Sequence, residues 1–314
     1  MPETLSVIIP TYNRRDLLAK TLDGYLNQSA ADQIGELVII DDGSTDDTRS
    51  MVERFVSRAL FPVRYLWQPN KGPAAARNAG IREARMNLIL FTDSDIIPHP
   101  DLVAQHVDWH KQHPQPQMAV LGYVTWPIEI RPTPFMRWYG EGKLFVFDRL
   151  RGQREADFQC FYTCNLSLKA AFLRANGQFD ESFVTAAYED TELGYRLSKR
   201  GLRLLYNPAA IGYHYQFFSF EDACRKARAN AEAAQLFFRK ESGQKALQTI
   251  RQRRSRPGYA IARTAATAAT KMLSPARPLL NSYTRLPNII YQLFYWHDAT
   301  RLVSYAELQE PGSY

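Results

Sequence analysis

The chain of 314 residues has little cysteine and no long apolar segment. Its three cysteines, Cys160, Cys164 and Cys224, are too few and too scattered for a disulfide framework or a zinc site of the CxxC kind. We expect Cys160 and Cys164 to be buried as small apolar side chains. No stretch approaches the roughly 18 uncharged apolar residues of a membrane-spanning helix. The first residues also lack the basic and apolar regions of a signal peptide. We therefore expect a protein of the reducing cytoplasm.

Positive charge is unevenly distributed along the chain. The net charge is +7, yet residues 225–301 contain 15 Lys and Arg against three acidic residues, and the remainder is net acidic. This contrast predicts a domain over residues 1–220 and a basic helical extension over residues 221–314. The basic segment 251–303 suits an anionic membrane surface, at roughly 1 kcal/mol for each Lys or Arg near it. A solvated helical face without a partner is the alternative.

Short apolar runs alternate with amphipathic segments through the first hundred residues. Four runs have the continuous hydrophobicity of strands buried on both faces: 5–10, 37–40, 63–67 and 88–91. Helical spacing lies between them, including an Ala-rich helix that starts near Pro73. The alternation predicts an α/β fold with a mostly parallel sheet and helices on both faces. Further strands are expected at 118–124, 161–168 and 203–206.

Acidic residues follow two of these runs directly. Asp41 and Asp42 come after the second run, and Asp93-Ser94-Asp95 comes after the fourth. Because ligands bind beyond the carboxyl ends of parallel strands, both clusters are expected at one edge of the sheet. Alternate carboxylates can approach Mg²⁺ or Mn²⁺, which proteins hold with one or two carboxylates and substrate phosphates. The first pair can accept a hydrogen bond from a base or ribose, or can simply form a turn.

Two other patterns have both a functional and a structural interpretation. Glu189-Asp190 could supply a general base, although acidic residues at a helix start are also favoured by the helix dipole. His106 and His110 have the i, i+4 spacing of a zinc helix. They lack the glutamate of a metalloprotease motif, so we expect no metal there.

Four segments, in order along the chain, resemble the motifs of family 2 glycosyltransferases with the GT-A fold. They are Ser-Val-Ile-Ile-Pro-Thr-Tyr-Asn at 6–13, Val-Ile-Ile-Asp-Asp-Gly-Ser-Thr-Asp at 38–46, Asn-Lys-Gly-Pro-Ala-Ala-Ala-Arg-Asn-Ala-Gly at 70–80 and Phe-Thr-Asp-Ser-Asp at 91–95. The segment 179–193 is also similar to the galactosyltransferase carboxyl-terminal type. The resemblance implies a nucleotide-binding half over residues 1–100 and an acceptor half over residues 101–220.

The resemblance implies a nucleotide site at the first acidic cluster. Asp42, with Asp41 beside it, would contact the base, usually uracil. The rest of the nucleotide pocket would consist of Pro10, Thr11, Tyr12, Lys71, Gly72, Arg77, Asp93 and Ser94. No Gly-rich phosphate loop follows the first strand, which argues against a pyrophosphorylase on a similar fold.

The resemblance also implies an inverting, metal-dependent sugar transfer. Asp93 and Asp95 would hold Mn²⁺ or Mg²⁺, with His214 either a further ligand or a packed histidine. Asp190 would take the proton of an acceptor hydroxyl, and Glu189 would support it. The donor would be a nucleotide sugar, usually a UDP-sugar, and the acceptor a glycan or glycolipid of the cell envelope.

The processive branch of this family carries a Gln-x-x-Arg-Trp motif and membrane helices, which this sequence lacks, so a single-sugar transferase is favoured. The competing hypothesis is a non-catalytic protein that binds a membrane or nucleic acid through its basic, aromatic-containing tail. That hypothesis does not explain the ordered acidic motifs, and we expect no nucleic-acid partner. We expect a cytoplasmic enzyme in peripheral contact with the inner face of the cytoplasmic membrane.

Overall fold

The computed structural model describes residues 3–140, 144, 147–254, 259–282, 284, 286–295 and 298. The chain forms two compact units. Unit 1 contains Met1–Ile130 and Arg149–Gln216, and unit 2 contains Arg131–Asp148 and Phe217–Tyr314. Unit 1 thus corresponds to most of the predicted 1–220 domain, whereas the segment 131–148 belongs to the other unit.

Unit 1 is built on a nine-stranded sheet with the order β3-β2-β1-β4-β8-β6-β9-β5, in which β7 also pairs with β9. The strands are β1 (Leu5–Thr11), β2 (Ile34–Asp41), β3 (Val63–Trp67), β4 (Leu88–Thr92), β5 (Ile96–Pro98), β6 (Met118–Thr125), β7 (Glu155–Ala156), β8 (Asn165–Lys169) and β9 (Arg203–His214). The first four in this order are parallel, as predicted. Beyond β4 the sheet is mixed, because β8 runs antiparallel to both β4 and β6.

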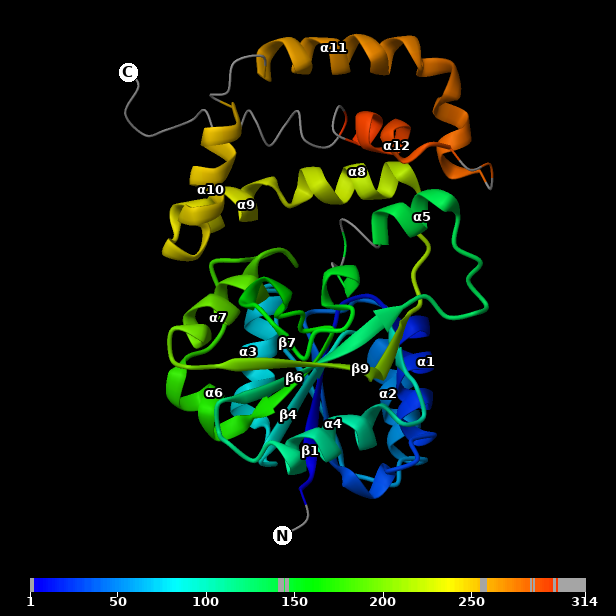
Figure 1. Cartoon of the computed structure of the whole chain (residues 1–314). Coiled ribbons are helices and arrows are strands. Elements are labelled where there is room, and N and C mark those ends of the chain that lie inside the picture. Colours follow the sequence, from blue (N-terminus) through cyan, green and yellow to red (C-terminus); the bar gives the residue numbers. More distant parts are fainter. Residues whose placement is uncertain are drawn as a thin grey trace. The chain divides into compact units, whose positions relative to one another are not determined.

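Helices cover both faces of the parallel half, with α3 on one face and α1 and α2 on the other (Figure 1). The helices and 3₁₀ turns of unit 1 are α1 (Arg15–Leu26), η1 (Ala31–Gln33), α2 (Thr48–Val56), α3 (Pro73–Glu83), α4 (Leu102–Gln112), η4 (Phe158–Cys160), α6 (Ala170–Asn176) and α7 (Glu189–Ser198). A further turn, η3 (Phe147–Leu150), falls at a boundary between the units.

The core explains why these runs form strands. Val7 and Ile9 are fully buried in a cluster with side chains of α1, α2 and α4, and Ile8 lies on the opposite face under α3. There, a Cβ added to Gly80 would lie 2.4 Å from the Ile8 Cγ2 atom, so only glycine permits this close packing. Burying each such aliphatic side chain contributes roughly 1.5–3 kcal/mol. This two-sided burial holds the carboxyl ends of β1, β2 and β4 at one edge.

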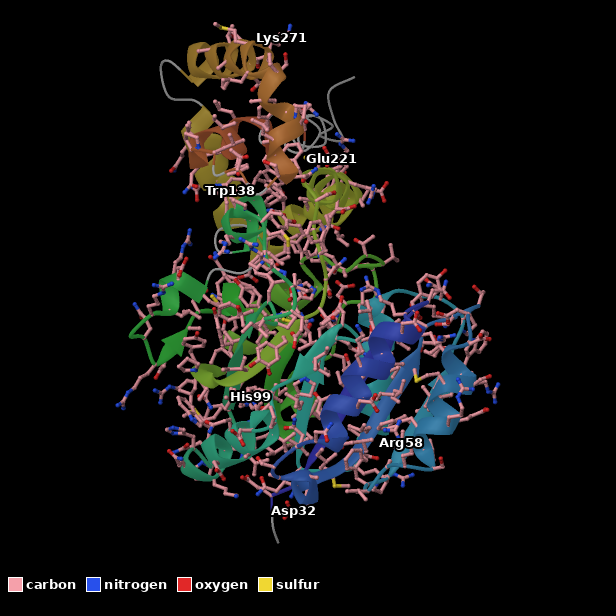
Figure 2. All side chains as sticks on the ribbon, turned by 90° about the vertical axis from the view of Figure 1, so that its right-hand side faces the viewer. Asp32, Arg58, His99, Trp138, Glu221 and Lys271 are labelled. Carbon is pink, nitrogen blue, oxygen red and sulfur yellow. The ribbon has the colours of Figure 1, made fainter. Side chains whose placement is uncertain are left out.

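Unit 2 is helical and has an aromatic core. Its elements are α5 (Pro134–Tyr139), α8 (Phe220–Ala229), α9 (Ala231–Arg239), α10 (Glu241–Arg254), α11 (Tyr259–Met272), η5 (Ser274–Asn281) and α12 (Asn288–Tyr295). Phe135 of α5 lies 5.4 Å from Phe220 and 5.9 Å from Tyr291 between ring centroids. These contacts explain why 131–148 joins the C-terminal helices. Trp138 lies on α5 and Lys271 is exposed near the end of α11 (Figure 2).

Within the residues that the structure describes, no helix has the length and hydrophobicity to cross a membrane. The part of the basic segment 251–303 that is described consists of the end of α10, α11, η5 and α12. Within that segment, residues 255–258, 283, 285, 296–297 and 299–303 lie outside the described residues.

Candidate active site

Asp41 and Asp42, at the end of β2, are buried and fix the loops around them. Asp41 accepts hydrogen bonds from the Ser44 N–H at 2.7 Å and from the Tyr65 hydroxyl at 2.5 Å. Burial and this carboxylate raise the pKa of the Tyr65 phenol, so Tyr65 stays a donor. The sequence indicated the two acidic residues but not Tyr65, whose place beside Asp41 follows from the pairing of β3 with β2.

Asp42 holds the 68–72 loop to the sheet edge. One carboxylate oxygen accepts from the Gln68 side-chain amide at 2.7 Å and from the Lys71 N–H at 3.0 Å, and the other accepts from the Gly72 N–H at 2.8 Å. The Asp42 N–H donates to the Thr11 carbonyl at 2.9 Å, which joins the ends of β1 and β2. The structure therefore brings together the predicted residues of 10–12, 41–42 and 71–72. Tyr12 is about half exposed beside them, at 49%.

Gly72 lets this loop lie against the segment that precedes α7. Its φ is +90°, a conformation that other residues rarely adopt, and a Cβ there would lie 2.5 Å from the Val184 carbonyl oxygen. A glycine is therefore required for two independent reasons, backbone conformation and space. The contact brings the 68–72 loop close to the segment before α7 within unit 1.

Arg77 joins the second and third acidic clusters. From its place on α3, one guanidinium nitrogen donates to Asp93 at 2.8 Å and the other to Glu189 at 2.8 Å. Arg77 is 4% exposed, and its guanidinium also lies 5.7 Å from the centre of the Phe179 ring. The Arg77 guanidinium and the Glu189 carboxylate are both buried, so their pairing offsets part of the cost of taking these two charges out of water, whereas Asp93 is partly exposed. The sequence predicted Arg77 to border the nucleotide, and the structure shows in addition that it links two acidic motifs.

Glu189 and Asp190 begin α7. Burial and the neighbouring Asp190 raise the pKa of Glu189 to about 7, against the opposing effect of Arg77. Burial also raises the pKa of Asp190, which Arg77 and the Thr191 N–H oppose. That N–H donates to Asp190 at 2.7 Å. A carboxylate with a raised pKa is a stronger base than an exposed one, as general-base catalysis requires.

Asp95 lies at the other side of the same acidic turn. Its carboxylate accepts from Arg14 at 2.7 Å and lies 3.5 Å from the His214 Nε2 atom. His214 ends β9, and the next residue, Tyr215, donates its N–H to the Asp95 carbonyl at 2.8 Å. The predicted neighbours Asp95 and His214 are thus adjacent. Ser94, between the two aspartates, accepts a hydrogen bond from the Thr21 hydroxyl at its carbonyl.

The predicted metal ligands form pairs rather than one cluster. Asp93 is paired with Arg77, and Asp95 with Arg14 and His214. Among the residues described, no group of three or more His, Cys, Asp or Glu side chains is placed to hold a metal ion. The oxygen donors of Asp93 and Asp95 still match a hard cation, which needs only one or two carboxylates when phosphates supply other ligands. The acidic turn therefore fits a metal that binds together with a diphosphate.

Cys164 is a site residue that the sequence did not indicate. Its thiol is buried, and burial together with the charges of Asp93 and Asp190 raises its pKa well above the ordinary value. The charges of Arg77 and Asp95 act on the same thiol. This small side chain thus lies near the acidic turn of Asp93 and Asp95 and near Asp190. It behaves as a neutral packing residue, as expected for a buried cysteine, but at the site rather than elsewhere in the core.

His106 and His110 are not arranged as a metal site. The Asn165 side-chain amide donates to the carbonyls of Tyr123 and Ala210 at 3.1 and 2.9 Å, so its oxygen faces the Nε2 atom of His106 at 2.8 Å. The other His106 nitrogen lies 2.8 Å from the Ser167 hydroxyl. Burial lowers the pKa of His106 to about 4, so this imidazole is neutral near pH 7.

The family assignment follows from comparison with known proteins. Residues 6–172, more than half of the chain, match the family described as glycosyl transferase family 2. The chain belongs to glycosyl transferase family 2, and its fold is the GT-A fold.

One sequence relative and two solved structures illustrate the similarity. Validoxylamine A glucosyltransferase of Streptomyces hygroscopicus subsp. limoneus is 36% identical over an alignment of 222 residues. The match covers 63% of this chain and 48% of the relative. The chain therefore spans about half the length of that relative. The mannosyltransferase PcManGT from Pyrobaculum calidifontis, in complex with GDP-Man and Mn²⁺, has a TM-score of 0.61 at 19% identity and covers 96% of this chain and 89% of its own. The S. aureus protein TarS 1–349 in complex with UDP has a TM-score of 0.53 at 20% identity, covering 74% and 65%.

Proposed function

We propose that this chain transfers a sugar from a nucleotide-sugar donor to an acceptor hydroxyl with inversion at the anomeric carbon. The observation that carries the proposal is the Arg77 bridge, which joins Asp93 of the acidic turn to Glu189 beside the candidate base. A diphosphate site and a base are thereby held in one cluster, as a direct displacement requires. Structures of the same fold contain UDP or GDP-Man, which supports a nucleotide-sugar donor, and we propose a UDP-sugar.

The reaction is a single displacement in which Asp190 acts as the base. The acceptor oxygen forms a bond to the anomeric carbon, its proton passes to Asp190, and the bond to the nucleoside diphosphate breaks on the opposite face. Arg77 fixes Glu189, the residue before Asp190 at the start of α7, and the Thr191 N–H donates to the Asp190 carboxylate. No covalent intermediate is required, and positioning of the two substrates is the larger part of the catalysis.

Asp93 and Asp95 are the residues that would hold Mn²⁺ or Mg²⁺. When bound, the metal supplies positive charge that stabilises the leaving diphosphate. Asp42 and its loop would bind the nucleobase of the donor, and the exposed Tyr12 ring beside them offers a surface on which the nucleobase can pack. The acceptor is proposed to be a glycan or glycolipid of the cell envelope, reached through contact of the basic segment 251–303 with an anionic membrane surface.

The test is donor hydrolysis, because it needs no acceptor. In the presence of Mn²⁺, the wild-type protein should slowly release UDP from a UDP-sugar. Asp190→Asn should lower this rate by about 10²–10⁴-fold, the usual contribution of a general base, while UDP binding stays within about twofold. Asp108→Asn, an exposed acidic residue on α4, is the matched control and should leave the rate unchanged. Equal rates in the two variants would remove Asp190 from the mechanism.

A further inference from the structure

Arg14 precedes α1 and lies against the acidic turn. Its Nη1 atom donates to the Asp95 carboxylate at 2.7 Å, and the Arg14 side chain is 37% exposed. To the residues that the structure describes, the guanidinium makes no second hydrogen bond. Arginine has five N–H donors, so most of them remain available to a ligand. The positive Arg14 side chain is thus paired with the Asp95 carboxylate, which the proposed function assigns to a divalent ion.

The backbone holds Arg14 in this position. The preceding residue, Asn13, has a φ of +50°, which asparagine adopts more readily than most residues, and its side-chain oxygen accepts from the Thr45 N–H at 2.8 Å. About two helical turns further on, the Thr21 hydroxyl donates to the Ser94 carbonyl at 3.0 Å. The helix that follows Arg14 is therefore fixed to the acidic turn at a second point. The pair with Asp95 is a built contact, unlike an isolated surface ion pair.

We propose that Arg14 is a positioning residue of the donor site that exchanges partners. In the free protein its guanidinium supplies the cation at Asp95. Once Asp95 binds a divalent ion, the guanidinium turns to the donor's diphosphate, whose oxygens match its planar fork of N–H donors. Arg14 therefore competes with the metal for Asp95 and cooperates with it in holding the diphosphate. This inference rests on the proposed function, because it takes Asp95 as the metal ligand.

The exchange predicts effects of opposite sign on two ligands. Mn²⁺ affinity is measured without nucleotide by electron paramagnetic resonance, and binding of Mn²⁺-pyrophosphate is measured by calorimetry. Arg14→Gln should bind Mn²⁺ about three- to tenfold more tightly, because the competing charge is gone. The same variant should bind Mn²⁺-pyrophosphate about tenfold more weakly, because it lacks the guanidinium contact.

Arg15→Gln is the control, since it removes the same charge one residue further along. Arg15 contacts Asp16 and Asp47 at the surface instead of Asp95. Its substitution should change either affinity by less than about twofold. Circular dichroism confirms folding of each variant. If Arg14→Gln fails to fold, Arg14→Lys tests the same claim: it should retain wild-type Mn²⁺ affinity and bind Mn²⁺-pyrophosphate more weakly, because lysine lacks the planar fork.

The outcomes separate this inference from the proposed function. If Asp95→Asn lowers Mn²⁺ affinity but Arg14→Gln behaves like Arg15→Gln, the exchange is wrong and the metal assignment stands. A shift of both affinities in the same direction in Arg14→Gln likewise overturns the exchange. If Asp95→Asn leaves Mn²⁺ affinity unchanged, or the wild type binds no Mn²⁺, both the metal assignment and the exchange are wrong.

Discussion

At the scale of single residues, Arg77 is central to the site because it pairs with one buried and one partly exposed carboxylate. Its guanidinium pairs with Asp93 and Glu189, and both Arg77 and Glu189 are almost fully buried, at 4% and 3% exposure. Removing one partner of a buried ion pair leaves an uncompensated charge, which costs about 3–5 kcal/mol. The same residue also opposes the rise in the pKa of Glu189 and Asp190.

We therefore expect Arg77→Gln to lower the free energy of unfolding by about 3 kcal/mol at pH 7. Urea denaturation followed by circular dichroism measures this change. Arg82→Gln on the same helix, at an exposed position, should change it by less than about 0.5 kcal/mol. Similar small losses in both variants would show that the Arg77 bridge does not stabilise the fold.

Glu189 should make stability fall as pH rises. Its pKa is about 7 in the folded chain and 4.5 as its ordinary value, because burial disfavours its charged form. Between these values the folded state keeps a proton that the unfolded state has released. The free energy of unfolding therefore decreases as pH rises through this window.

Glu189→Gln removes this dependence. The stability of the variant relative to the wild type should rise between pH 5 and pH 8, by on the order of 1–3 kcal/mol, in thermal or urea unfolding at several pH values.

His106→Gln is the counterpart, since burial lowers the pKa of His106 from 6.5 to about 4. In the wild type, the contribution of His106 to the free energy of unfolding is fully present above pH 6.5 and is lost as the pH falls towards 4. Relative to the wild type, His106→Gln should therefore become more stable as the pH falls; parallel profiles for the two variants would contradict both assignments.

At the scale of elements, the 68–72 loop shows how a helix start becomes part of the candidate nucleotide site. Gly72 immediately precedes α3, its N–H donates to Asp42, and its Cα lies against Val184. Three segments from different parts of the chain thus depend on one residue without a side chain. The motif containing Lys71 and Gly72 indicated a nucleotide site from the sequence, but not the packing that makes glycine necessary.

Gly72→Ala should lower stability by more than about 2 kcal/mol and weaken UDP binding, because strain in φ adds to a backbone clash. Gly201→Ala is the matched control. Gly201 has a φ of +88°, but no atom lies within 4 Å of an added Cβ, so only the conformational cost of about 1 kcal/mol remains. Thermal unfolding with and without UDP measures both effects. Equal losses in the two variants would show that the Val184 contact is unimportant.

At the scale of the whole molecule, charge and fold divide along similar lines. Unit 1 carries the acidic site, and the basic excess of residues 225–301 lies in unit 2. The described part of unit 2 has an aromatic core formed by α5, α8 and α12, and its described basic residues include Arg225 and Lys226 of α8 and Lys271 of α11. This supports the proposal that the basic segment 251–303 contacts an anionic surface.

Vesicle sedimentation tests that proposal. The full chain should sediment with vesicles containing phosphatidylserine, and about 0.5 M salt should weaken the binding because it screens the charges. Two charge-matched triple variants are compared, with glutamine in place of Arg251, Arg253 and Arg254 at the end of α10, or of Arg49, Arg54 and Arg58. The second set is exposed in unit 1, where Arg58 is labelled in Figure 2. Only the substitution of Arg251, Arg253 and Arg254 should weaken binding to the anionic vesicles. Equal binding of the wild type to neutral vesicles at all salt concentrations would rule out the proposal.

The sequence by itself determined the parallel strands, the acidic residues at their ends and the family motifs, because these depend on local periodicity and on turns next to strands. Strands β1 to β4 agree with the prediction to within a few residues. The short strands β5 and β7 and the extension of β9 to His214 were not predicted, since they depend on pairing with distant strands rather than on local hydrophobicity.

Only the tertiary structure decided which charges meet. Arg77 and Glu189 are 112 residues apart in sequence, and Arg14 and Asp95 are 81 apart, so no local pattern relates them. The place of Cys164 beside these groups and the packing of Phe135 among the C-terminal helices were equally hidden. Such contacts arise when the sheet brings remote strand ends to one edge, where burial strengthens each electrostatic interaction.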